Sequence, residues 1–385
     1  MSNLEQILGT FESISKEVIA VDADLTDQKA RWPERAIRII QQEGLAGLVI
    51  PEKYGGLGCG LYALARASEI IGQACGSTGL CFAMHCVGSA VVASAKTDSL
   101  KKRFLEPISQ GEHITSLALS EAGTGSHFYL PQTTLKAFDH DQYVIQGTKT
   151  FCTSAAHADS YVVSTVAEEV DAPIGQFSCV MVEADTNGIS YGPKWSGLGM
   201  RGNSSRSVTL DKVYIPKTNL LGNEGDEIHY IFNVIAPYFM VALSGVYLGI
   251  AQAALEIAKA HMLKRNFSHS GTSLAQQPIL QHRLGILMGM IERTRSLIYR
   301  AAQKFENADT DAVSTVMLAK AEVADCVTTV VNEVMTLCGG IAYQDGSKLH
   351  LLLRNARAVH VMSPTTDILR TWAGRSLLDL PLLGD

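Results

Sequence analysis

The stretch Ala118-Leu-Ser-Glu-Ala-Gly-Thr-Gly-Ser-His127 decides the fold, and it follows an apolar run, Ile114-Thr-Ser-Leu-Ala118. Its two glycines and its small, hydroxylated residues predict a loop whose backbone N–H groups and hydroxyls approach a ligand closely. A second stretch, Gly147-Thr-Lys-Thr-Phe-Cys-Thr-Ser-Ala-Ala-His-Ala-Asp159, has a similar composition. Alone, each stretch is more typical of an ordinary turn or hairpin than of a ligand site. Their order among the surrounding segments favours a ligand site.

Between residues 114 and 222 the chain is typical of short β-strands. Segments such as Gln142-Tyr-Val-Ile-Gln-Gly147 and Ser207-Val-Thr-Leu-Asp-Lys-Val-Tyr-Ile-Pro216 are rich in β-branched and aromatic residues. No helical pattern lies between them, which predicts an antiparallel β barrel or sandwich. Within this region Gly197-Leu-Gly-Met-Arg-Gly202 matches the dinucleotide pattern G-x-G-x-x-G. It lacks the strand before and the helix after that a dinucleotide site needs, so we reject that interpretation.

Helical periodicity occupies the two flanking regions. We expect an all-α domain over residues 1–113, the β domain over 114–222, and a four-helix bundle over 223–385, giving an α+β multi-domain fold. The segment from His229 to Leu255 has no residue of fixed charge and is long enough to span a membrane. Its internal polar residues and glycines favour a helix buried in the bundle instead.

Composition excludes several other classes of function. The net charge of −6 gives no electrostatic footprint for nucleic acid, and no polybasic run predicts a membrane surface. The eight cysteines and the histidines lack metal-ligand spacing, so we expect no metal. The first residues lack the layout of a signal peptide, and reduced thiols then predict a cytoplasmic protein.

The order of helical, β and helical regions, with both ligand stretches in place, resembles the acyl-CoA dehydrogenase family. The segment Gly44-Leu-Ala-Gly-Leu-Val-Ile-Pro-Glu-Lys-Tyr-Gly-Gly-Leu-Gly58 is similar to the N-terminal signature of that family. The resemblance implies FAD between the β domain and the bundle, and homotetramers whose subunits share flavin sites. It also implies an acyl thioester as substrate, carried by coenzyme A or a carrier protein. The electron acceptor would be an electron-transferring flavoprotein or oxygen.

The resemblance also assigns expected cofactor contacts. In the first loop and the second stretch these are Leu119, Ser120, Gly125, Ser126, Phe151 and Thr153. Phe151 stands where relatives usually have tryptophan, and Thr153 matches a hydroxyl that bonds the flavin N5 edge. Residues expected to serve the flavin of a neighbouring subunit are Arg265, Phe267 and Gln277. The remaining expected contacts are Gly339, Gly340, Thr365 and Asp367.

The chain departs from the family at the catalytic base. Relatives remove an α-proton with a glutamate, and the matching position here is Ser363, followed by Pro364 instead of glycine. The alternative base position on a bundle helix falls near Phe239. A serine hydroxyl cannot take an α-proton unaided, because its pKa lies far above neutrality. The candidates for a displaced base are therefore the histidines His85 and His127, with His360 one turn before Ser363.

Three interpretations of function stay open at this point. The leading one is an FAD enzyme that oxidises an acyl thioester with an unusual or displaced base. The second is a flavin-dependent monooxygenase or oxidase on the same scaffold, which needs no α-carbon base. The third is a flavin-binding protein without turnover, because fold alone does not specify chemistry.

Overall fold

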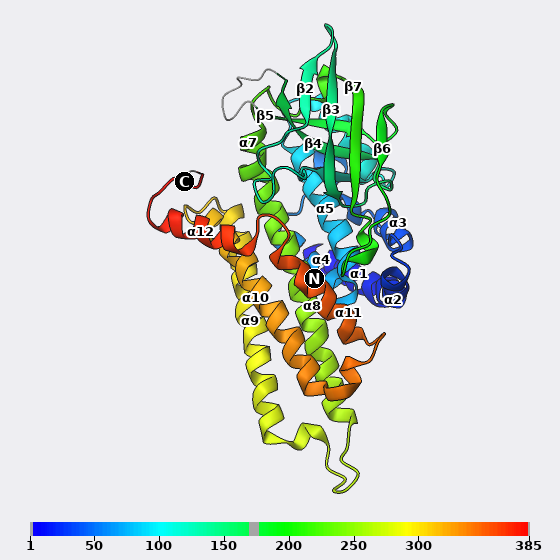
Figure 1. The fold of residues 1–385 in the computed structure, drawn as a ribbon, viewed down its shortest axis with the longest axis vertical. Helices are drawn as coiled ribbons and strands as arrows, with labels where there is room; N and C mark the ends of the chain where they lie inside the picture. Colours follow the sequence, from blue (N-terminus) through cyan, green and yellow to red (C-terminus); the bar gives the residue numbers. More distant parts are fainter. Residues whose placement is uncertain (1–2, 169–176, 384–385) are drawn as a thin grey trace.

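A computed structural model describes residues 3–168 and 177–383, and it shows an elongated molecule built from three parts (Figure 1). A group of N-terminal helices and a β sheet lie at one end, and long C-terminal helices extend from them. The predicted boundaries at 113/114 and 222/223 fall in the connections between helix and strand at either end of the sheet region. The N-terminal helices are α1 (Asn3–Ile14), α2 (Ala20–Gln28), α3 (Glu34–Gln42), α4 (Leu61–Ala74), α5 (Gly76–Ala93) and α6 (Asp98–Ser109).

The described residues of the central region form a seven-stranded sheet in the order β1-β4-β2-β3-β7-β6, with β5 paired to β4. Most pairs are antiparallel, as expected, but β1 and β2 both pair with β4 in parallel. The β2–β3 hairpin supplies the long connection that a parallel neighbour requires. The strands are β1 (Thr115–Ala118), β2 (Thr134–Ala137), β3 (Gln142–Cys152), β4 (Ser160–Ala167), β5 (Phe177–Glu183), β6 (Ile189–Tyr191) and β7 (Arg206–Pro216).

The described C-terminal region is helical, as the sequence predicts. Its three long helices, α8, α9 and α10, pack together, and the shorter α11 and α12 also pack against α10. Helix α8 contacts α9 and α10, and α12 crosses α10 near the sheet. Between α8 and α9 the chain makes a hairpin at the far tip of the bundle (Figure 1). The helices are α7 (Glu227–Tyr230), α8 (Ala236–Lys264), α9 (Pro278–Glu306), α10 (Ala312–Cys338), α11 (Lys348–Arg357) and α12 (Thr366–Leu377).

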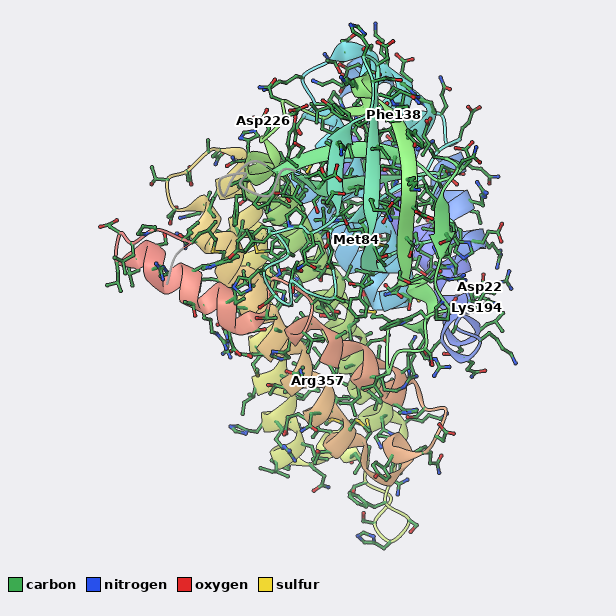
Figure 2. All side chains as sticks on the ribbon, turned by 45° about the horizontal axis from the view of Figure 1, so that its top comes forward. Asp22, Met84, Phe138, Lys194, Asp226 and Arg357 are labelled. Atoms are coloured by element: carbon green, nitrogen blue, oxygen red, sulfur yellow. The ribbon has the colours of Figure 1, made fainter. Side chains whose placement is uncertain are left out.

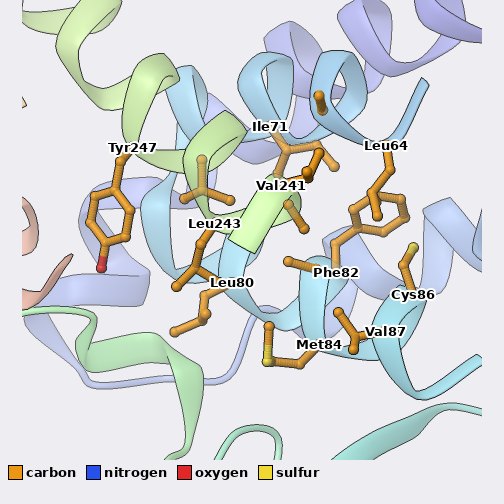
Figure 3. Close-up of a cluster of buried hydrophobic side chains, with 14 of the residues drawn as sticks. Leu64, Ile71, Leu80, Phe82, Met84, Cys86, Val87, Val241, Leu243 and Tyr247 are labelled. Atoms are coloured by element: carbon orange, nitrogen blue, oxygen red, sulfur yellow. The ribbon is translucent and has the colours of Figure 1, made fainter. Parts of the chain in front are cut away.

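One hydrophobic core joins the N-terminal helices to the bundle. Leu64 and Ile71 of α4, Phe82 and Cys86 of α5, and Val241 of α8 meet in it (Figure 3). Glycines let these helices approach closely: a Cβ atom on Gly72 would lie 2.3 Å from the backbone oxygen of Val246. The core therefore fixes α5, which carries part of the site, against α8.

Three helical segments are long and apolar enough to cross a membrane, namely Gly76–Ala93, Glu227–Lys264 and Ala312–Tyr343. In the second, which contains the uncharged stretch discussed above, 83% of the most apolar window is buried inside the protein. Helix α8 packs against α4 and α10, so its apolar side chains are covered by the protein itself. This is the buried bundle helix that the sequence favours.

Candidate active site

A cavity of about 670 Å³ lies where the three parts of the chain meet. Helix α5 contributes Leu80 and Met84, which lie one turn apart on one helix face, while Phe82 and Cys86 point into the core. Figure 2 places Met84 near the centre of the molecule, between the sheet and the C-terminal helices. The other walls come from the loop after β1, the end of β3, residues 199–205, the start of α8, and residues 358–365.

The cavity brings together eight of the residues predicted from the sequence. They come from three separate segments, and the first two are tied directly because the Thr150 N–H donates to the Ser120 carbonyl at 2.7 Å. A second tie runs from the Ser116 hydroxyl to the Thr153 carbonyl at 2.8 Å. The eight residues are Leu119, Ser120, Gly125, Ser126, Phe151, Thr153, Ser363 and Thr365.

A buried ion pair holds the first loop against β3. Lys149 Nζ donates to Glu121 Oε1 at 2.6 Å and to Ser164 Oγ at 3.0 Å. The Glu121 carboxylate also accepts from the backbone N–H groups of Gln132 and Thr133. Burial acts to raise the pKa of Glu121, but the charge and hydrogen bond of Lys149 outweigh it and leave this pKa below its ordinary value. These bonds fix the loop after β1 through Glu121, and its residues Ser120 and Ser126 remain free to line the cavity.

Glu121 is the sole ionisable side chain among the described residues of the cavity wall. Its carboxylate is fully engaged in the bonds just described, so it is not free to accept a proton from a ligand. Ser363 also lines the cavity, in the position that the family resemblance assigns to the missing glutamate. The walls thus offer hydroxyl groups and apolar surface but no free carboxylate among the residues described.

His85 does not line the cavity. Its ring is 2% exposed; Nδ1 accepts from the Thr115 N–H at 3.2 Å, so Nε2 carries the proton and donates to the Ala46 carbonyl at 3.1 Å. Burial lowers the pKa of His85 to about 4, which keeps the ring neutral. The structure therefore places this predicted base in a packing role between α5 and β1.

His127 and His360 lie near the cavity without lining it. His127 is exposed and follows Ser126, which does line it; the ring contacts Tyr129 with centroids 5.9 Å apart. His360 lies 3.1 Å from the Thr366 hydroxyl and 3.4 Å from that of Thr328. Of the predicted bases, His127 alone keeps a ring that makes no hydrogen bond within the described part of the chain.

An open groove of about 580 Å³ adjoins the cavity. Val361 and Thr365 line both spaces, so the groove adjoins the cavity at these two residues. Asp367, predicted near the cofactor, is exposed and lines this groove together with Arg357 and the half-buried His360. The groove therefore lies beside the cavity and shares two residues of its wall.

The residues expected to serve a neighbouring subunit lie far from this cavity in the single chain. Arg265, Phe267 and Gln277 belong to the hairpin between α8 and α9, at the tip of the bundle (Figure 1). Gly339 and Gly340 follow the C-terminal end of α10 and are exposed, and a Cβ atom added to either would meet no described atom within 4 Å. Surfaces of this kind are open to a second copy of the chain, and the assignment stays a prediction.

Sequence reasoning missed the apolar half of the cavity and one aromatic residue. Trp195 lies beside Phe151 with ring centroids 6.1 Å apart, and Phe151 itself is 64% exposed with φ +54°. Gly199 and Met200 come from the segment rejected as a dinucleotide motif, which instead forms part of the wall of the site. The one-turn spacing of Leu80 and Met84 was a usable signal, but it is indistinguishable from ordinary core spacing.

These residues fit the flavin that the sequence predicts. Ser120, Thr153 and Thr365 present hydroxyls, and the buried Thr150 Oγ1 has no hydrogen-bond partner in the described structure. An isoalloxazine edge is a row of hydrogen-bond donors and acceptors, so such groups suit it. Among the described residues no group of three His, Cys, Asp or Glu side chains is placed to hold a metal ion.

Comparisons with known proteins identify the family of all three parts of the chain. Models of the N-terminal, middle and C-terminal domains of acyl-CoA dehydrogenase match residues 2–112, 116–213 and 240–378. The chain is 28% identical to the probable acyl-CoA dehydrogenase YngJ of Bacillus subtilis (strain 168), over 95% of this chain and 96% of that protein. It is also 28% identical to the cyclohex-1-ene-1-carbonyl-CoA dehydrogenase of Geobacter metallireducens, over 96% and 97% of the two chains.

The fold is shared with solved structures. Butyryl-CoA dehydrogenase from Megasphaera elsdenii superposes with a TM-score of 0.92 at 22% identity, over 98% of this chain and 99% of that one. The predicted fold class is thereby confirmed, and so are the expected cofactor, FAD, and the expectation of an enzyme. This chain belongs to the acyl-CoA dehydrogenase family of FAD-dependent oxidoreductases.

Proposed function

We propose that the protein catalyses the FAD-dependent α,β-dehydrogenation of an acyl thioester whose acyl group is uncharged. The observation that carries this proposal is the composition of the cavity wall. Its inner part is apolar, and its one ionisable side chain among the described residues, Glu121, is neutralised by Lys149. A charged acyl group would enter this space without a partner, at a desolvation cost that an alkyl or alicyclic group avoids. Those apolar residues are Leu80, Met84, Leu117, Phe128, Ile235 and Phe239.

The chain offers distinct groups to the two ends of FAD. The hydroxyls of Ser120 and Thr153 would hold the ring system in the cavity, and the adjoining groove beyond Thr365 would take the phosphate-bearing arm. When bound, FAD supplies the acceptor for the hydride that leaves the β-carbon of the substrate. The protein's own task is to align the acyl chain against that ring, to exclude water and to receive the α-proton.

For the α-proton we propose His127 as the displaced base. Ser363 occupies the usual base position and lacks the basicity, while both ring nitrogens of His85 are committed. His127 sits directly after Ser126 of the cavity wall, and an imidazole is the side chain best suited to proton transfer near neutral pH.

We further propose a cytoplasmic homotetramer that passes electrons to an electron-transferring flavoprotein. Arg265 and Gln277 are out of reach of the cavity in one chain, so a second copy would have to present them. The bundle also leaves apolar side chains uncovered, including Ile279, Ile286 and Met288 on α9. Light scattering on FAD-saturated protein tests the assembly, and a stable monomer holding FAD would contradict it.

The decisive experiment is anaerobic bleaching of the bound flavin by a matched panel of thioesters. Butyryl, isovaleryl and cyclohexenecarbonyl thioesters should bleach it, offered both on coenzyme A and on a phosphopantetheine carrier protein. Glutaryl and prolyl thioesters of similar size, which carry a charge, should bleach it at least about tenfold more slowly, as about 1.4 kcal/mol of uncompensated desolvation implies. Bleaching by NAD(P)H or amines, with none by any thioester, would overturn the proposal.

A further inference from the structure

The cavity depends on a segment with little regular structure of its own. We call residues 358–365 the strap, because they run from the end of α11 to the start of α12 across one side of the cavity. Six strap residues line the cavity, and only a short 3₁₀ turn, Ala358–His360, orders the segment internally. The six are Ala358, Val361, Met362, Ser363, Pro364 and Thr365.

One buried lysine of a different helix holds the strap. Lys320 of α10 is 0% exposed, and its Nζ donates to the carbonyls of Val359 at 2.8 Å, Met362 at 3.0 Å and Pro364 at 2.9 Å. An ammonium group has three N–H donors, so these three carbonyls satisfy it completely. The three acceptors flank Ser363 on both sides, and their direction toward Lys320 fixes the backbone on which the Ser363 and Thr365 side chains are carried.

The chemistry of this contact is unusual for a structural lysine. No carboxylate pairs with Lys320 within the described residues, so a cation is buried against backbone dipoles alone. Burial lowers the pKa of Lys320 to about 7. Hydrogen bonds to the three carbonyls favour the ammonium over the neutral amine. An apolar side chain of similar length would fill the same space at a smaller desolvation cost, but it would leave three carbonyls without a donor.

We propose that Lys320 is a positioning residue for catalysis, whose ammonium keeps the strap, and with it Ser363 and Thr365, in register with the cofactor and substrate across the cavity. The kinetic part of this inference rests on the proposed dehydrogenation. The structural part concerns the strap alone and needs no substrate. Because a displacement of about 1 Å at a reacting centre costs up to about 10²-fold in rate, a loosened strap should affect chemistry more than binding.

The test compares Lys320→Met with Val334→Ala, both in the FAD-saturated full chain. Met keeps the length of the side chain and removes the donors, while Val334→Ala weakens the fully buried core of the same helix without touching the strap. In Lys320→Met we expect amide hydrogen exchange over 358–365 to rise at least about tenfold, and the visible circular dichroism of bound flavin to change. Both readouts should stay as in the natural protein in Val334→Ala.

The rate constant for flavin reduction by a good thioester should fall at least about tenfold in Lys320→Met, with the Kd of the thioester changed less than about threefold. Lys320→Arg keeps charge and donors and should restore most of the rate and of the exchange protection. If Lys320→Met does not accumulate as folded protein, Lys320→Gln replaces it in the test. Gln keeps two donors on a shorter side chain, so we expect smaller changes in hydrogen exchange, flavin dichroism and reduction rate.

Two outcomes separate this inference from the proposed function. If no thioester reduces the natural protein, the proposed function fails, while exchange and circular dichroism still decide the role of Lys320. If Lys320→Met or Lys320→Gln keeps strap protection, flavin dichroism and reduction rate unchanged, Lys320 does not position the strap.

Discussion

Two buried lysines each hold one segment of the cavity wall, and they do so in different ways. Lys149 fixes the loop after β1 through a carboxylate, Glu121, whereas Lys320 fixes the strap through three carbonyls. The first contact is a buried ion pair, and removing either partner leaves the other charge buried and unpaired. In the second, removing the lysine leaves only neutral dipoles without a donor. Two lysines that are buried to a similar extent therefore differ in how much stability is lost when each is replaced.

The largest effect should follow from breaking the first contact. Lys149→Met leaves Glu121, which is 7% exposed, as an uncompensated buried charge. Loss of one partner of a buried pair costs about 3–5 kcal/mol, so we expect that decrease in the free energy of unfolding and poor retention of FAD. Urea unfolding of the apoprotein measures it. Lys259→Met, in an exposed pair with Glu256, is the control and should change stability by less than about 0.5 kcal/mol.

A double-mutant cycle on Lys149 and Glu121 tests whether the charge of the pair accounts for this loss of stability. Adding Glu121→Gln to Lys149→Met removes the orphaned charge and should recover a substantial part of the lost stability. No recovery in the double variant would mean that Lys149 acts through packing and not through its charge.

A second titratable group in the same region predicts a pH dependence. Glu227 is 0% exposed, neither carboxylate oxygen has a hydrogen-bond partner in the described structure, and burial raises its pKa to about 8. The folded state therefore binds this proton more tightly than the unfolded state, whose pKa is near 4.5. Its contribution to stability is complete below about pH 4.5 and is lost as pH rises through about 8, by on the order of 3–5 kcal/mol in total.

Urea unfolding of the apoprotein between about pH 5.5 and about pH 8.5 measures this loss. Glu227→Gln, which is neutral at every pH, should flatten that part of the profile. An unchanged slope in the variant would show that the proton is not on Glu227.

Much of the fold was predictable because its signals are local. The change of period near residue 114 and its return near 223 are visible in the sequence, and in the structure β1 begins at Thr115 and α7 at Glu227. The parallel pairing of β1 with β4 was not predictable, since strand partners far apart in sequence leave no local trace.

The site was predictable only where glycines and hydroxyl groups cluster. Ser120, Thr153 and Ser363 reach one cavity, as their motifs indicated. His85 looked equally promising, but its role depends on Ala46 and Thr115, which no spacing reveals. Lys320 carried no signal at all, because a single lysine on a helix is usually exposed.

The two histidines give the next smaller effects and should separate chemistry from stability. His127→Ala should slow flavin reduction by a thioester at least about 10²-fold, equivalent to about 2.7 kcal/mol, without lowering the melting temperature. His85→Ala should lower unfolding free energy by about 1–3 kcal/mol, because it leaves the Thr115 N–H and Ala46 carbonyl unsatisfied. Stopped-flow reduction and thermal unfolding distinguish these outcomes. If His85→Ala slowed flavin reduction at unchanged stability, while His127→Ala reduced its flavin at the natural rate, the base would be His85 and not His127.

The smallest effect concerns Ser363, the strap residue at the position of the missing base. Its hydroxyl lines the cavity but is too weakly basic to take an α-proton, so Ser363→Ala should change the rate of flavin reduction by less than about threefold. If Ser363→Ala alone abolished rapid reduction, Ser363 would be an activated participant in the reaction.

A stronger experiment places a carboxylate at position 363. Because Lys320 holds the backbone on both sides of Ser363, Ser363→Glu in the His127→Ala background should place a base in the cavity and restore part of the lost rate. Restoration in that double variant, but not when Lys320→Met is added, would link the geometry of the strap to the transfer of the proton.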